Sequence, residues 1–114
     1  MIAAVSTPTA PRTVLVLGRS AHGVTLPPVA EIRDTILVLA IGWPLTDIQR
    51  AVLDSAEELA RTARVVLDAH LVPSAAAAAA FVGSGDRLVL DASPRETRRI
   101  RRRITPRITA PGER

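Results

Sequence analysis

The chain has 114 residues, of which 47% are apolar, and a formal net charge of +4. This length indicates one domain with room for a core. The sequence contains no cysteine and no lysine, which excludes disulfides, thiolate metal sites, Cys nucleophiles and lysine-based catalysis. Two histidines, His22 and His70, are too few for a His-only metal site, and no metal or cofactor is expected. No apolar run reaches the roughly 18–20 residues that span a bilayer, and no signal peptide is indicated, which favours a cytoplasmic protein without membrane contact.

The first part of the chain predicts a flexible leader and then a buried strand. Residues 1–12 mix Ser, Thr, Pro and Ala, whereas Thr13–Leu17 is continuously apolar. The spacing of Gly18–Thr25 is that of a Walker A phosphate loop, but Val24 occupies the position of its lysine and Pro27-Pro28 interrupt any following helix. Two interpretations follow: a plain glycine turn, or a degenerate loop that binds phosphate.

A second strand is predicted before the first aromatic residue of the chain. Residues 29–33 fit an edge strand or one turn of helix, and Thr35–Ile41 is the strongest strand signal, because it is apolar and rich in β-branched residues up to Gly42. Trp43 is the single Trp. It is interpreted either as a lid over one end of the core or as a contact residue at a partner surface.

The clearest helix is predicted over residues 46–62. Thr46 and Gln49 form a capping-box pattern at its start. Helical spacing predicts one buried stripe. Its members are Ile48, Ala51, Val52, Ser55, Ala56, Leu59 and Ala60.

A strand, a short helix and another strand follow, which predicts a βαβ unit with parallel strands. The first strand is expected over residues 64–68, with Asp68 at its C-terminal end, where parallel sheets bind ligands and partners. Residues 69–73 are expected to form a loop. Ser74 is placed as the N-cap of an alanine-rich helix, and residues 87–90 as the next strand.

The last helix is predicted to begin with a second capping box, Ser93 and Glu96, with a Pro at its first position. It is expected to run to about Arg103 and to end at Pro106, with Thr97, Ile100 and Ile104 as its apolar stripe. The whole is expected to be α/β: a single domain over residues 13–104, with a mostly parallel sheet of four to five strands and three helices, and a flexible tail over residues 105–114.

Positive charge is concentrated near the C-terminus, since seven of the fifteen arginines lie between Arg95 and Arg107. Such a cluster produces a strong local field. It fits three interpretations: contact with nucleic-acid phosphate through residues 95–107, docking on an acidic partner, or a solvated helix face. The candidate contacts are Arg95, Arg98, Arg99 and Arg102.

The order of elements over residues 29–104 resembles a STAS domain, the domain of sulfate transporters and anti-sigma factor antagonists. Val65-Val66-Leu67-Asp68 and Arg87-Leu88-Val89-Leu90 before Ser93-Pro94 carry this resemblance. It implies a STAS-like sheet, an anti-sigma kinase or similar regulator as partner, and a regulatory serine at Ser74. The usual Asp and Gly around that serine are Pro73 and Ala76 here, which fits a degenerate member that binds without being switched.

The sequence therefore favours a non-catalytic protein-interaction domain in a bacterial regulatory system, with Ser74, Asp68 and Trp43 as candidate partner contacts. The alternatives are a nucleic-acid-binding protein that uses the Arg-rich helix and a degenerate P-loop domain. An enzyme is not expected, because no nucleophile–base pair is indicated. A β-hairpin within residues 13–40 would favour the STAS-like fold, and a strand–loop–helix there a Rossmann-like or P-loop fold.

Overall fold

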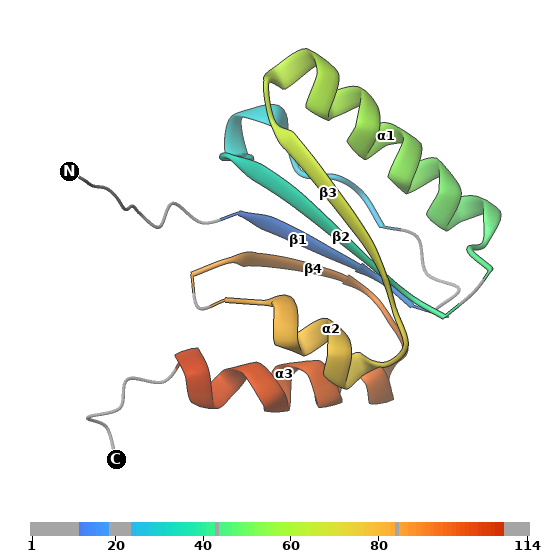
Figure 1. Cartoon of the computed structure of the whole chain (residues 1–114), viewed down its shortest axis with the longest axis vertical. Helices are drawn as coiled ribbons and strands as arrows, with labels where there is room; N and C mark the ends of the chain where they lie inside the picture. Colours follow the sequence, from blue (N-terminus) through green and yellow to red (C-terminus); the bar gives the residue numbers. More distant parts are fainter. Residues whose placement is uncertain (1–11, 19–23, 43, 84, 109–114) are drawn as a thin grey trace.

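The computed structural model describes residues 12–18, 24–42, 44–83 and 85–108, and the side chains up to residue 104. Within these residues the chain has four strands and three α-helices, with an α-helix after each of β2, β3 and β4 and one short 3-10 turn, η2, before β2 (Figure 1). In chain order these elements are β1 (Thr13–Leu17), η2 (Val29–Glu31), β2 (Thr35–Ile41), α1 (Asp47–Ala63), β3 (Val66–Val72), α2 (Ala75–Phe81), β4 (Arg87–Asp91) and α3 (Pro94–Ile108).

The strands form one all-parallel, four-stranded sheet in the order β3-β2-β1-β4. This confirms the predicted α/β class with a mostly parallel sheet and three helices. Strand β1 lies at the centre, with Leu15 between Val38 of β2 and Val89 of β4. All five of its residues are buried, as its continuous apolarity predicts.

Both faces of the sheet are covered (Figure 1). On one face, α2 and α3 pack against alternate strand residues, and this cluster includes Val14, Val16, Leu37, Leu39, Ala78, Ala79, Ile100 and Ile104. On the other, α1 and the β1–β2 connection pack against the remaining ones, and this cluster includes Leu15, Leu17, Ile32, Ile36, Val38, Val52 and Ala56. The alternation follows from the two-residue period of a strand.

Strands β1 and β2 are parallel, so residues 13–40 do not form a β-hairpin. The hairpin that would favour the STAS-like fold is therefore not present. Among the described residues of the β1–β2 connection, 24–34, only the η2 turn is helical. A P-loop directs the N-terminus of an α-helix at the phosphates, and this stretch does not supply one. Residues 19–23, including His22, lie outside the described residues.

The capping box of α1 is confirmed: the backbone N of Gln49 donates to Thr46 Oγ1 at 3.1 Å, and the Thr46 N donates to Gln49 Oε1 at 3.0 Å. The predicted apolar stripe, however, is wrong at Ile48, Ala51 and Ser55, which are exposed. Gln49 is buried instead. The buried face of α1 therefore differs from the predicted stripe, since it includes Gln49, whose side chain reaches Gly18 and Asp91 at the end of the sheet.

Strand β3 is longer than predicted. It continues through residues 69–72, where a loop was expected, because these residues pair with Val38–Ile41 of β2. Asp68 consequently lies inside the strand and not at its C-terminal end. The prediction that Asp68 marks the carboxyl edge of the sheet is therefore wrong.

Helix α3 begins as predicted, because the Glu96 N donates to Ser93 Oγ at 3.2 Å and the Ser93 N donates to Glu96 Oε1 at 3.3 Å. Its end differs, since the helix extends past Pro106 to Ile108. A proline within a helix removes one backbone N–H donor, but here the helical conformation continues for two residues beyond Pro106. Ile100 and Ile104 are buried, as the predicted stripe requires.

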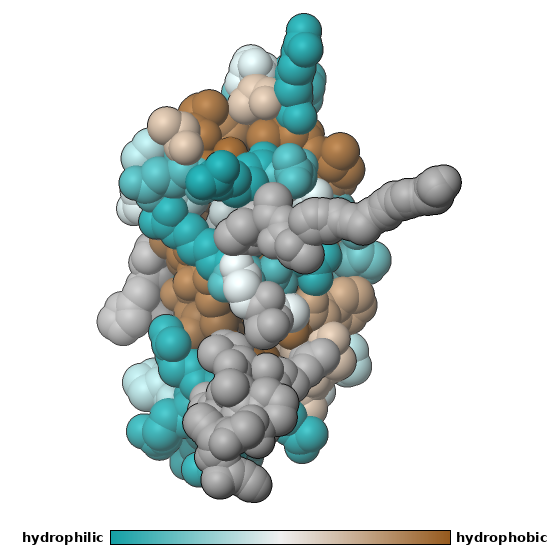
Figure 2. All heavy atoms as spheres, turned by 90° about the vertical axis from the view of Figure 1, so that its left-hand side faces the viewer, coloured by the Kyte–Doolittle hydropathy of each residue, from teal (hydrophilic) through white to brown (hydrophobic). Residues whose placement is uncertain are grey.

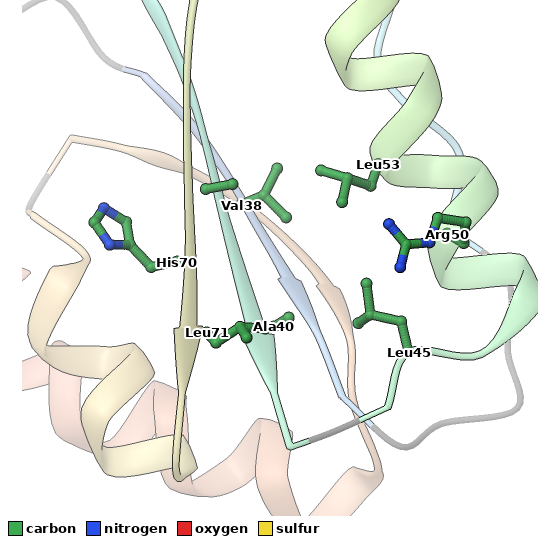
Figure 3. Close-up of a pocket in the computed structure, with 8 residues that line it drawn as sticks. Val38, Ala40, Leu45, Arg50, Leu53, His70 and Leu71 are labelled. Atoms are coloured by element: carbon green, nitrogen blue, oxygen red, sulfur yellow. The ribbon is translucent and has the colours of Figure 1, made fainter.

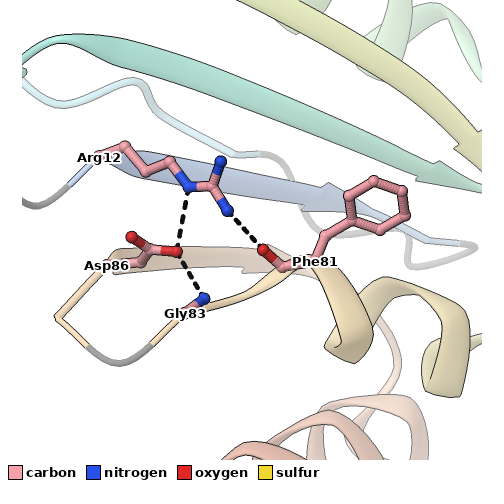
Figure 4. A network of polar contacts seen from close by, with 4 residues as sticks. All are labelled: Arg12, Phe81, Gly83 and Asp86. Carbon is pink, nitrogen blue, oxygen red and sulfur yellow. Dashed lines mark hydrogen bonds and ion pairs between the residues drawn. The ribbon is translucent and has the colours of Figure 1, made fainter. Parts of the chain in front are cut away.

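A polar network joins the start of β1 to the turn between α2 and β4 (Figure 4). Arg12 Nε lies 3.2 Å from Asp86 Oδ2, and Arg12 Nη2 donates to the carbonyl oxygen of Phe81. The same Asp86 oxygen accepts from the Gly83 N at 2.7 Å. The network fixes the end of α2 against the amino edge of the sheet.

Candidate functional site

Ser74 lies between β3 and α2 and caps the helix. Its Oγ accepts a hydrogen bond from the Ala77 N at 3.2 Å, and the residue is exposed. This is the N-cap position predicted from the sequence. The hydroxyl is therefore both structurally used and open to solvent.

Ser74 shares one pocket of about 300 Å³ with arginines of α3. We call this surface the Ser74 face, and its residues are Ser74, Ala75, Ala76, Arg99, Arg102 and Arg103. The elements meet because α2 and α3 cover the same face of the sheet. The small alanines of α2 permit close packing against Ile100, whose side chain is fully buried.

The Ser74 face carries three arginines that are not engaged in ion pairs with the described side chains. Within residues 12–104, where side chains are described, Arg99, Arg102 and Arg103 form no ion pair. Guanidinium groups bind carboxylates and phosphates through paired N–H donors, and an exposed hydroxyl adds a further donor. This arrangement is suited to an anionic group on a ligand or partner.

A shallow hollow continues from the Ser74 face along α2. Ala76, Ala79, Ala80 and Arg103 line it, and its volume is about 260 Å³. Its lining combines the alanine methyl groups with polar atoms and is more polar than apolar.

The other predicted site residues lie apart from this face. Asp68 is in the middle of β3, and its Oδ1 lies 2.9 Å from His70 Nε2; about 13 Å of strand separates it from the end of β3. Arg95 and Arg98 are exposed on α3 but do not line the Ser74 pocket. Trp43 lies outside the described residues.

A polar cluster at the carboxyl edge of the sheet was not predicted. Gln49 Nε2 donates to the carbonyl oxygen of Gly18 and lies 3.4 Å from Asp91 Oδ2. The second oxygen of the buried Asp91, Oδ1, has no hydrogen-bond partner in the described part of the chain. The cluster joins the ends of β1 and β4, the neighbouring strands between which the strand order reverses its direction along the sheet. No group of three or more His, Cys, Asp or Glu residues that could hold a metal ion occurs among the described residues.

An apolar groove of about 250 Å³ lies between α1 and β3 (Figure 3). Leu45 and Leu53 form its α1 side, and Ala69 and Leu71 form its β3 side. His70 points to the opposite side of β3 in Figure 3. The groove therefore lies on the α1 face of the sheet, over β2 and β3, with Val38 and Ala40 also in its lining.

Comparison with known proteins gives no relative: no family model, no curated protein and no solved structure matches the chain. Among the described helices, none is long and apolar enough to cross a membrane.

Proposed function

We propose that this chain is a non-catalytic protein-interaction domain of a bacterial regulatory system, and that its Ser74 face binds an acidic surface of the partner. The single observation that carries this proposal is the shared pocket of Ser74 and Arg99, Arg102 and Arg103. Within the described side chains these arginines have no internal counter-ion. The STAS-like affiliation with an anti-sigma kinase as partner rests on the sequence resemblance alone.

The physical basis is charge complementarity. An exposed arginine cluster raises the rate of encounter with an acidic partner and disfavours basic ones. Ser74 adds a regulatory possibility to the same surface, because a phosphate on its hydroxyl would bring negative charge to these arginines. Such a modification would neutralise the face and weaken its binding to an acidic partner.

Affinity capture from the source cells with the full chain as bait tests this proposal. The retained protein should be lost with the Arg99→Ala/Arg102→Ala variant and kept with the Arg95→Ala/Arg98→Ala variant. Both variants remove two charges from the same helix, so they differ only in the surface affected. Equal retention by both variants, or no retained protein with the unmodified chain, would contradict the proposal.

A second candidate function, nucleic-acid binding by α3, is favoured by one observation. Six exposed arginines lie on this helix within the described side chains: Arg95, Arg98, Arg99, Arg101, Arg102 and Arg103. They surround most of its circumference, which suits sequence-independent contact with phosphates. In that case all six arginines should contribute similarly to binding, whereas binding through the Ser74 face should depend mainly on Arg99, Arg102 and Arg103.

A further inference from the structure

Strand β3 is an open edge of the sheet. Among the described strands it pairs with β2 alone, because the order is β3-β2-β1-β4. The Val66 N donates to the backbone carbonyl oxygen of Asp34, and the Val72 carbonyl oxygen accepts from the Gly42 N. The backbone N–H and C=O groups of every second residue, Val66, Asp68, His70 and Val72, therefore point toward β2. Successive residues of a strand direct these groups to opposite sides. The N–H and C=O groups of Leu67, Ala69 and Leu71 consequently point outward.

This edge also exposes apolar side chains. Val66 is 65% exposed and Leu71 is 62% exposed, the largest fractions among the described large hydrophobic residues. Figure 2 shows the side of the molecule where β1, β2 and β4 begin, and hydrophobic surface lies there between hydrophilic side chains. A seven-residue edge without proline or a bulge is open to pairing with another strand.

The sequence of β3 is complementary to itself when it is read in the opposite direction. In Val66-Leu67-Asp68-Ala69-His70-Leu71-Val72, an antiparallel copy centred on Ala69 places Val opposite Val and Leu opposite Leu. It also places Asp68 of each copy opposite His70 of the other. This is the symmetry of an isologous, two-fold interface.

The backbone geometry agrees with this centre. Ala69, Leu67 and Leu71 have outward N–H and C=O groups, and in this register they face one another as hydrogen-bonded pairs, which would form about six hydrogen bonds. Asp68 and His70 then occupy non-hydrogen-bonded pairs, in which opposing side chains are closest. A second strand slid by one residue, which places the centre between two residues, would face outward groups with inward ones.

The two faces of β3 suit the same arrangement. Asp68 and His70 project toward the α2 side, where the His70 ring lies 4.9 Å from that of Phe81. Two copies would therefore bring their 2.9 Å Asp68–His70 pairs together into one cluster of alternating carboxylates and imidazoles. On the α1 side, Leu71 borders the apolar groove and would be covered by Leu67 of the second copy.

We propose that β3 pairs antiparallel with β3 of a second copy of this chain, Ala69 opposite Ala69, so that two four-stranded sheets form one continuous sheet. The other edge, β4, is also self-complementary in sequence, but it is two residues shorter than β3 and its Asp91 is buried, whereas Val66 and Leu71 of β3 are exposed. The interface is separate from the Ser74 face. Failure of one proposal leaves the other intact.

Analytical ultracentrifugation of the full chain over a concentration series tests the pairing. The expected mass is twice that of the chain. His70→Asp should raise the dimer dissociation constant about tenfold or more, because it places carboxylates opposite one another twice. Asp68→Arg should raise it as well, because it removes both Asp68–His70 contacts between the copies. An equimolar mixture of these two variants should form a mixed dimer, since their altered positions are again complementary.

The mixture also separates pairing from folding, because a variant that fails to fold cannot be rescued by another. Leu71→Asp should weaken the dimer, whereas Val29→Asp, which removes a side chain of similar exposure (54%) elsewhere, should not. A wild-type chain that stays at single mass over the whole series would overturn the proposal. So would a mixture of the two charge variants that stays monomeric, or equal effects of Leu71→Asp and Val29→Asp.

Discussion

The side-chain nitrogen of Gln49 in α1 lies 3.4 Å from the carboxylate of Asp91 at the end of β4. Strand β4 is one neighbour of β1 in the sheet, and β2 is the other. The same amide also donates to the Gly18 carbonyl at the end of β1. One buried residue therefore connects the capping box of α1 with the ends of two strands. This explains why a polar residue occupies the buried side of α1.

Replacement of Gln49 by leucine should lower the free energy of unfolding by about 2–4 kcal/mol, because it leaves the Gly18 carbonyl and Asp91 buried with fewer partners. Urea denaturation followed by circular dichroism measures the change. Arg50→Ala, on the adjacent exposed position, is the control and should change stability by less than about 0.5 kcal/mol. A Gln49→Leu variant as stable as this control would show that the contacts have no structural role.

Gly18 should not tolerate a side chain. A Cβ atom there would lie 2.8 Å from Glu96 Oε1 and 3.1 Å from both Ala92 Cα and Asp91 O. Two of these contacts are with backbone, which cannot move aside easily. We expect Gly18→Ala to destabilise the fold by about 1–3 kcal/mol, whereas Gly85→Asn, at a positive φ without close neighbours, should cost less. Thermal unfolding of both variants compares them; equal melting temperatures would contradict the packing argument.

Ile100 should be essential for holding α3 on the sheet. Its side chain is fully buried and packs in one cluster with residues of α2 and of the strands. We expect Ile100→Ala to cost about 2–5 kcal/mol through lost burial and a cavity. Arg98→Ala on the exposed side of the same helix is the control, and denaturant midpoints are the measurement. A deletion of residues 95–114 would remove both buried residues, Ile100 and Ile104, together with the arginines. Single substitutions therefore separate the packing role of α3 from its charge.

Elution from heparin separates the two candidate functions. If α3 binds nucleic-acid phosphate, Arg95→Ala/Arg98→Ala and Arg99→Ala/Arg102→Ala should lower the eluting salt concentration equally, because each removes two exposed charges. If the Ser74 face is the binding surface for anions, only the second variant should elute clearly earlier. Unchanged elution of both variants would argue against either role for these arginines.

Local signals predicted the parts of the fold that depend on a few neighbouring residues. Thr46 with Gln49 and Ser93 with Glu96 both form their hydrogen-bonded caps, because a capping box is complete within one turn of chain. Ser74 caps α2 for the same reason. The continuous apolarity of Thr13–Leu17 and Thr35–Ile41 predicted the two central strands correctly.

Contacts between distant residues account for the errors. The burial of Gln49 depends on Gly18 and Asp91, which are 31 and 42 positions away. Residues 69–72 join β3 because β2 continues beside them, a fact that their own mixed polarity does not reveal. The pocket shared by Ser74 and Arg99 depends on the packing of α2 against α3. The two residues were each predicted as candidates, but not as one site.

NMR chemical-shift mapping of the full chain with a polyglutamate peptide tests the central claim, that the Ser74 face binds acidic groups. We expect the largest amide shift changes at residues 74–76 and 99–103, and their loss in the Arg99→Ala/Arg102→Ala variant but not in Arg95→Ala/Arg98→Ala. Shift changes spread evenly along α3, or equally reduced by both variants, would contradict the claim.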